Sequence, residues 1–170
     1  LRDRFLHDEN APLTLRLDGE GLSLQADGQG LRGDFVKMLP RVKAGMPAHE
    51  MLVKTAKIKN AVGTLTAVDA TAGLGEDSIL LAAAGFHVTM FEKNPVIHAL
   101  LTDALDRAKA IPELAEIVGR MALRHADSIE GMKNLDFTPD VILLDPMFPA
   151  RQKSALVKKK LQMIQKLEFP

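Results

Sequence analysis

The sequence contains no cysteine, no tryptophan and no tyrosine. Without cysteine the chain can form no disulfide, no thiolate metal site and no cysteine nucleophile. An excess of charge of one sign is also lacking, because 22 Lys and Arg residues balance 22 Asp and Glu residues. This balance excludes a globally basic nucleic-acid binder. With 46% hydrophobic and 26% charged residues, the composition is that of a folded protein rather than a disordered one.

Long apolar runs are missing as well. No stretch approaches the roughly 18 apolar residues that a membrane-spanning helix needs, and residues 1–10 lack the apolar centre of a signal peptide. We therefore expect a cytoplasmic protein with no membrane partner. The histidines show no metal-ligand spacing, so we also expect no metal, and nothing points to an obligate protein partner.

The first sixty residues are predicted to be rich in β-structure. Leucines alternate with polar residues over 13–17 and again over 22–24, which is typical of a β-hairpin. A third strand is expected over 31–36. Proline and glycine then indicate a linker, and a helix is expected over 47–59. We expect this extension, with its linker helix, to occupy residues 1–60.

From residue 61 to residue 170, short apolar strands alternate with helices. This alternation predicts βαβ units, a mostly parallel sheet and a Rossmann-like α/β domain. Strands in such a sheet are buried on both faces, which fits the continuous apolar run at 141–144. The expected strands are 65–69, 87–91, 122–125 and 141–144, and the expected helices are 76–84, 95–110, 114–121, 128–135 and 153–167.

A glycine-containing loop, within TAVDATAGLGEDS, follows the first of these strands. The strand ends at Asp69, and Gly73 and Gly75 would let the backbone turn tightly and approach a ligand, although a plain strand-to-helix turn is the alternative. A dinucleotide would place its pyrophosphate at the following helix N-terminus, where Glu76 and Asp77 would repel it. These acids, with Asp69, favour a cationic ligand such as S-adenosylmethionine, or they simply complement the helix dipole.

Two later strand ends carry further acids. Glu92 ends the second strand, where a carboxylate can accept hydrogen bonds from ribose hydroxyls, and Lys93 beside it would offer backbone contacts. Asp127 and Ser128 follow the third strand and are candidates for binding an adenine amino group. Capping of the next helix by Asp127 is the alternative.

The fourth strand ends in the sequence DPMFP, which resembles the Asp-Pro-Pro-aromatic motif of methyltransferases that act on exocyclic amines. The Asp145 carboxylate and the Pro146 carbonyl would accept the N–H groups of the amine and orient it for attack. Phe148 could stack on the base. Met147 departs from the motif, and a proline-bounded loop with a buried Phe148 is the alternative.

Positive charge is concentrated locally although the total is zero. Residues 31–60 carry seven Lys and Arg against two acids, and residues 151–170 carry six against one. Arg151 and Lys153 directly follow the Asp-Pro motif, so we expect them to contact RNA phosphates.

Four stretches, DATAGLGEDS, FEKNPV, HADS and LDPMFPARQKSALVKKK, resemble the ribosomal RNA small subunit methyltransferase J family. The resemblance covers most of the chain and is strongest over 68–160. It implies a class I S-adenosylmethionine-dependent methyltransferase fold with a small β extension, and N2-methylation of a guanine in 16S ribosomal RNA, as naked RNA or in the ribosomal subunit. Such a sheet has more strands than the four expected here, so we expect its C-terminal strands to be missing. The resemblance assigns cofactor contacts to Glu76, Asp77, Glu92, Lys93, Asp127, Ser128 and Asp145, with Glu76 standing where the family often has Arg.

Other functions remain open at this point. The chain could methylate an amine of another nucleic acid, a protein or a small molecule. It could also be a non-catalytic RNA-binding module with a degenerate cofactor fold, and a nicotinamide oxidoreductase is the least favoured alternative.

Overall fold

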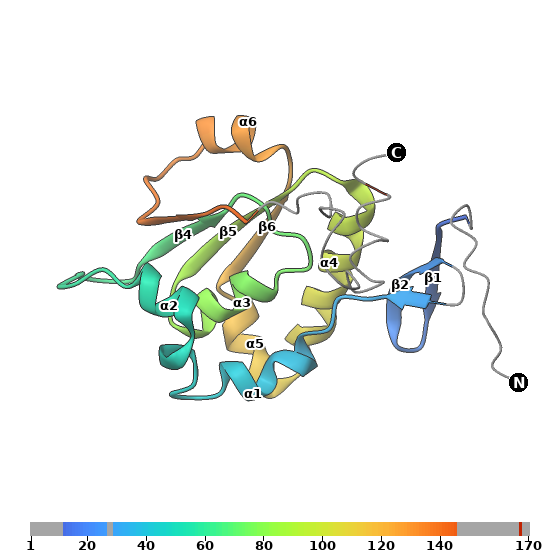
Figure 1. Ribbon diagram of the computed structural model, residues 1–170, viewed down its shortest axis with the longest axis horizontal. Helices are drawn as coiled ribbons and strands as arrows, with labels where there is room; N and C mark the ends of the chain where they lie inside the picture. Colours follow the sequence, from blue (N-terminus) through green and yellow to red (C-terminus); the bar gives the residue numbers. More distant parts are fainter. Residues whose placement is uncertain (1–11, 27–28, 146–166, 168–170) are drawn as a thin grey trace, which may run out of the picture.

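A computed structural model describes residues 12–26, 29–145 and 167. In this part of the chain, a three-stranded antiparallel sheet in the order β1-β2-β3 precedes a four-stranded parallel sheet in the order β6-β5-β4-β7 (Figure 1). The strands are β1 (Thr14–Asp18), β2 (Gly21–Ala26), β3 (Gln29–Leu31), β4 (Thr66–Asp69), β5 (His87–Glu92), β6 (Met121–His125) and β7 (Val141–Leu143). The α-helices are α1 (Leu39–Val42), α2 (Met51–Ala56), α3 (Glu76–Ala83), α4 (Pro95–Lys109), α5 (Pro112–Val118) and α6 (Ser128–Lys133), and the short 3₁₀ helices are η1 (Phe35–Met38) and η2 (Pro47–His49).

The parallel sheet forms the centre of the Rossmann-like body, as the alternation of strands and helices predicts. The helices α3, α4 and α5 lie on one side of the sheet, and α6 lies on the other side (Figure 1). Ala67, Val88 and Met90 point toward the α3 side and are fully buried in the larger core. Val68 and Phe91, on the opposite face, are buried as well, so both faces of β4 and β5 are covered and their apolar side chains point to both sides of the sheet.

Local signals predict the ends of α3 and α4 correctly, whereas the helix predicted over 114–121 lies at Pro112–Val118 and Met121 already belongs to β6. The Asn94 Oδ1 atom accepts hydrogen bonds from the backbone N–H groups of Val96 and Ile97, and Pro95 stands at the first helical position of α4. Helix α3 is followed by Gly85 with a φ of 101°, in the left-handed region that glycine adopts without strain.

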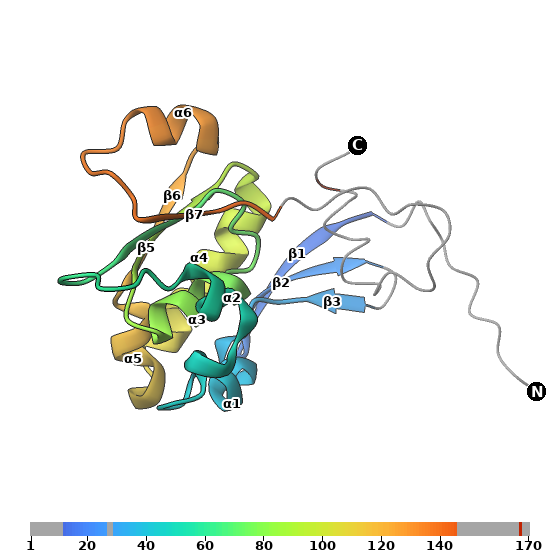
Figure 2. The same ribbon diagram turned by 60° about the vertical axis from the view of Figure 1, so that its left-hand side comes forward.

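The β-rich extension packs against α4, beside the body rather than as part of its sheet (Figure 2). Leu24 and Leu31 form a small core with Ile97 and Leu100 of α4. The Arg107 Nη2 atom of α4 donates a hydrogen bond of 2.5 Å to the carbonyl of Gly33. The predicted division at residue 60 stays a prediction.

Two predicted elements of the extension region are wrong in position. The third strand lies at Gln29–Leu31 rather than 31–36, because Asp34 accepts a hydrogen bond from the Val36 N–H and caps η1 instead. The predicted helix over 47–59 is split into η2 and α2, because Glu50 adopts an extended backbone between them.

Two other segments have partly exposed apolar residues, and for the strand at 141–144 this differs from the prediction. In α2, Val53 and Ala56 are the buried residues, whereas Met51 faces solvent. In β7, which is an edge strand among the described residues, Ile142 is 57% exposed rather than buried. The predicted helix 153–167 lies outside the described residues except for its last position.

Candidate functional site

The candidate site lies where the four parallel strands end, because the carboxyl ends of parallel strands meet at one edge of a sheet. The loop after β4 spans neighbouring strands at this edge. The Ala70 N–H donates to the Leu143 carbonyl at 3.0 Å, and the Ala72 N–H donates to the Phe91 carbonyl at 3.2 Å. The glycine loop is thereby tied to the ends of both β7 and β5.

Asp69, the last residue of β4, is a buried carboxylate with two donors. Its side chain is 2% exposed, and the Ser78 Oγ atom donates to its Oδ2 atom at 2.6 Å. The Thr71 N–H donates to its Oδ1 atom at 3.0 Å. Burial raises the pKa of Asp69, and these two hydrogen bonds oppose that rise.

Three carboxylates act on one another at this edge. Burial raises the pKa of Asp77, and the negative charge of Asp145 raises it further, while the positive charge of Arg41 opposes the rise. The charges of Asp77 and Asp145 also raise the pKa of Asp69. Because like charges held close together are costly, this cluster suits a cationic ligand and disfavours a pyrophosphate.

Glu92 joins the glycine loop to the turn after β5. Its side chain is 6% exposed, its Oε2 atom accepts from the Gly73 N–H at 3.2 Å, and its Oε1 atom accepts from the Asn94 N–H at 2.7 Å. Lys93 is exposed, and its carbonyl lies 3.1 Å from the His125 Nε2 atom. The expected nucleoside contacts therefore occupy adjacent strand ends.

Asp127 and Ser128 lie after β6, the strand next to β5. The Asp127 Oδ1 atom accepts from the Ile129 N–H at 2.9 Å and caps α6. The capping role that the sequence offers as the alternative is thus present. A carboxylate has two oxygens, so capping is compatible with a ligand contact.

The two glycines of the loop lie in different surroundings. A Cβ atom at Gly75, whose φ is 76°, would lie 2.9 Å from Leu101 Cδ1 and 3.1 Å from Phe35 Cζ. A Cβ at Gly73, whose φ is 53°, would meet only the Thr71 carbonyl, at 3.9 Å. Gly75 thus permits close packing against the core, and Gly73 is the glycine with an open side.

Several polar contacts at this edge are missing from the sequence-based expectations. Thr71 Oγ1 accepts a hydrogen bond of 2.9 Å from the Asp145 N–H. Arg41, on α1, donates from Nε and Nη2 to the two carboxylate oxygens of Glu50 at 2.8 and 2.7 Å. The rings of His98 and His125 lie 4.6 Å apart beside the end of β6. Of these contacts, only the one made by Thr71 has a signal in the sequence, namely the position of Thr71 within the glycine loop.

Some expected site residues lie outside the described residues, namely Pro146, Phe148, Arg151 and Lys153. Among the residues that the structure describes, no group of three or more His, Asp or Glu side chains could hold a metal ion. No helix in the same part of the chain is long and apolar enough to cross a membrane.

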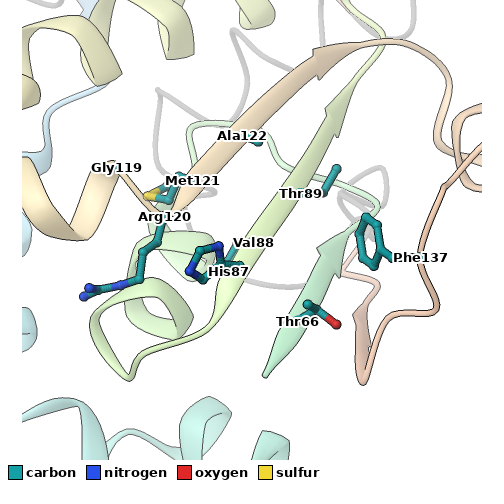
Figure 3. A pocket seen from close by; sticks show the side chains of 9 residues that line it. All are labelled: Thr66, His87, Val88, Thr89, Gly119, Arg120, Met121, Ala122 and Phe137. Carbon is teal, nitrogen blue, oxygen red and sulfur yellow. The ribbon is translucent and has the colours of Figure 1, made fainter. Parts of the chain in front are cut away.

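A pocket of about 280 Å³ lies at the opposite edge of the parallel sheet, where the strands begin (Figure 3). Thr66, His87 and Met121, the first residues of β4, β5 and β6, contribute to its lining. Phe137, from the segment between α6 and β7, lies beside these strands. The pocket is therefore separate from the carboxylate cluster and adds nothing to it.

Comparison with known proteins identifies similar sequences and similar solved structures. The model of a family described as "Putative SAM-dependent methyltransferase" matches residues 1–168. The ribosomal RNA small subunit methyltransferase J of Marinobacter nauticus is 42% identical in an alignment of 162 positions, which covers 91% of this chain and 58% of that protein. The enzyme of the same name from a Shewanella species is 40% identical in an alignment of 173 positions, which covers 98% of this chain and 66% of that protein. The chain therefore spans less than two thirds of the length of these relatives.

The crystal structure of a SAM-dependent methyltransferase from Neisseria gonorrhoeae aligns with a TM-score of 0.71 and 31% sequence identity. The alignment covers 84% of this chain and 60% of that one. Together with the parallel sheet, this similarity confirms the class I Rossmann-like fold that the sequence predicts.

Proposed function

Because this chain belongs to the family of putative SAM-dependent methyltransferases, we propose that it methylates the exocyclic N2 amine of a guanine in small-subunit ribosomal RNA. The relatives named ribosomal RNA small subunit methyltransferase J support the substrate class. The observation that carries the proposal is the group of carboxylates around the glycine loop, namely the buried Asp69 together with Asp77 and with Asp145, whose backbone N–H donates to Thr71 of the loop.

S-adenosylmethionine, when bound, supplies a methyl group on a positively charged sulfur. The residues at the strand ends fit the groups of this cofactor. Asp69 and Asp77 would attract its ammonium group, Glu92 would accept hydrogen bonds from the ribose hydroxyls, and Asp127 would accept from the adenine amine. Glu92 is held in place by the backbone N–H groups of Gly73 and Asn94, which donate to its two carboxylate oxygens.

Asp145 and Pro146 would position the nucleophile. The lone pair of an aryl amine is delocalised into the ring, so the amine attacks poorly unless it is oriented. The Asp145 carboxylate and the Pro146 carbonyl would accept its two N–H groups and stabilise the positive charge that grows on nitrogen. The proton can leave to solvent after the methyl group has moved, so no strongly basic side chain is needed. Phe148 would stack on the guanine.

The first test measures ligand binding and product together. Calorimetry should show binding of S-adenosylhomocysteine and none of NADH. Incubation with S-adenosylmethionine and small ribosomal subunits that lack the modification should yield one N2-methylguanine, detected by nucleoside mass spectrometry. An Asp145→Ala variant should lose transfer while it still binds S-adenosylhomocysteine.

The possible outcomes separate the alternatives. Cofactor binding with transfer only to small amines would replace ribosomal RNA as the substrate. RNA binding without any cofactor binding would indicate a non-catalytic module. Full activity of Asp145→Ala would remove Asp145 from the reaction.

A further inference from the structure

Thr71 connects the glycine loop to the residue proposed to hold the amine. Its Oγ1 atom accepts a hydrogen bond of 2.9 Å from the Asp145 backbone N–H, across 74 positions in sequence. Its own backbone N–H donates to the Asp69 Oδ1 atom at 3.0 Å. Thr71 therefore contacts both Asp69, which is proposed to attract the cofactor, and the backbone of Asp145, which is proposed to hold the amine.

The end of β7 has few other restraints among the described residues. The strand ends at Leu143, whose carbonyl accepts from the Ala70 N–H at 3.0 Å. Leu144 is 67% exposed, and Asp145 is exposed too, so neither side chain is held by burial in the core. In this part of the chain, the hydroxyl of Thr71 is thus the contact that fixes the Asp145 backbone.

We infer that Thr71 is a positioning residue for methyl transfer, which sets the place of Asp145 relative to the cofactor through its hydroxyl. The inference rests on the proposed function. Transfer requires the attacking and donating atoms to be aligned at about 3–3.5 Å, and a displacement of about 1 Å can slow a reaction about 100-fold. The Thr71 hydroxyl belongs to the glycine loop and holds Asp145. It therefore controls the distance between the bound amine and the methyl group of the cofactor.

The hydroxyl can be removed with little change in shape. Thr71→Val keeps the branched side chain and leaves the backbone donor to Asp69 intact, but its methyl group cannot accept from the Asp145 N–H. Thr71→Ser keeps the acceptor and loses only a methyl group. Thr102→Val is a matched control, because the Thr102 Oγ1 atom donates to the His98 carbonyl on the exposed side of α4.

Three measurements test the inference in the full chain. Thr71→Val should lower kcat by about 10- to 100-fold. Its Kd for S-adenosylhomocysteine should stay within about twofold, because the backbone contact to Asp69 is unchanged. Amide hydrogen exchange at Asp145, followed by NMR, should become faster. Thr71→Ser and Thr102→Val should keep the wild-type kcat and the wild-type exchange rate at Asp145.

Each contrary result overturns the inference in a recognisable way. An unchanged kcat or unchanged exchange at Asp145 in Thr71→Val would show that the hydroxyl does not position this acid. A loss of cofactor affinity as large as the loss of kcat would assign Thr71 to cofactor binding instead. A wild-type chain that transfers no methyl group at all would overturn the proposed function and, with it, this inference.

Discussion

At the scale of single residues, Asp69 is a carboxylate that is almost fully buried and has two hydrogen-bond donors. Burial raises its pKa above the ordinary value of 3.8, while Ser78 and the Thr71 N–H stabilise its charge. The folded protein therefore binds the Asp69 proton more tightly than the unfolded chain does. This residue makes stability fall as the pH rises from about 3.8 through the higher pKa of the folded state. Above that pKa its effect is constant.

Ser78→Ala should destabilise the protein in a pH-dependent way. The substitution removes the donor 2.6 Å from Asp69 and raises the pKa of that carboxyl further. At pH 7 the free energy of unfolding should fall by about 1–3 kcal/mol, the range for a buried acceptor that loses its partner. The loss should shrink as the pH falls through the pKa of Asp69, because a protonated carboxyl is cheaper to bury.

Urea unfolding at several pH values measures this effect. Thr55→Ala is the control, because its hydroxyl donates to the Met51 carbonyl on an exposed helix surface. The control should show a small loss that does not depend on pH. A loss for Ser78→Ala that is equal at low and neutral pH would mean that Asp69 is not the group responsible.

At the scale of secondary-structure elements, the close approach of α6 to the sheet depends on Gly131. A Cβ atom there would meet the ring of Phe91, with Cδ1 at 2.7 Å and Cζ at 2.9 Å. Phe91 is 2% exposed and cannot swing away freely. Since α6 begins with the cap at Asp127, its position also places the proposed adenine contact.

Gly131→Ala should push α6 away from the sheet. Overpacking of this kind costs about 1–3 kcal/mol of stability, and the affinity for S-adenosylhomocysteine should fall as the Asp127 cap moves. Gly19→Ala is the matched control, because nothing lies within 4 Å of a Cβ atom at Gly19. Thermal unfolding followed by circular dichroism, together with calorimetry, checks both effects. Wild-type stability in Gly131→Ala would contradict the close contact.

Helices and strands can be predicted from sequence where the signals that begin and end them are local. Helix α4 is predicted within about one residue because its signals, Asn94 and Pro95, act locally. The helix over 47–59 is predicted too long because the extended backbone of Glu50 has no local signal. Glu50 pairs with Arg41, nine positions away, and such a tertiary contact does not show in helix periodicity.

At the scale of the whole molecule, the gathering of the acids at one edge of the sheet is predictable from sequence, but the hydrogen bonds that connect them to the loops are not. The acids at strand ends follow from parallel topology, since strand ends meet at one edge. The contact between Thr71 and Asp145 spans 74 positions and has no pattern in the sequence. Ile142 of β7 is exposed because β7 is an edge strand among the described residues. The apolar sequence at 141–144 does not indicate this position.

The neutral total charge does not show which basic residues are free to bind a ligand, because some of them are paired with acids. Of the seven Lys and Arg in residues 31–60, three have acidic partners among the residues that the structure describes. Arg32 binds Asp18 and Glu20, Arg41 binds Glu50, and Lys37 binds Asp34. Four exposed lysines have no ion pair with another described residue, namely Lys43, Lys54, Lys57 and Lys59. Under the proposed function, RNA phosphates would bind these unpaired lysines in preference to the basic residues already paired with acids.

Replacing three of these lysines should therefore weaken RNA binding in a salt-dependent manner. We expect the Lys54→Gln, Lys57→Gln, Lys59→Gln triple variant to bind small-subunit RNA more weakly, with a slope of log K against log salt that is smaller by about 2. A control triple variant carries Gln at Lys37, Lys109 and Lys133, each of which is paired with an acid. Both variants change the net charge equally, so an equal loss in both would mean that total charge, rather than these unpaired lysines, governs binding. Filter binding at several salt concentrations distinguishes the two, and an unchanged slope in the first variant would place the RNA elsewhere on the surface.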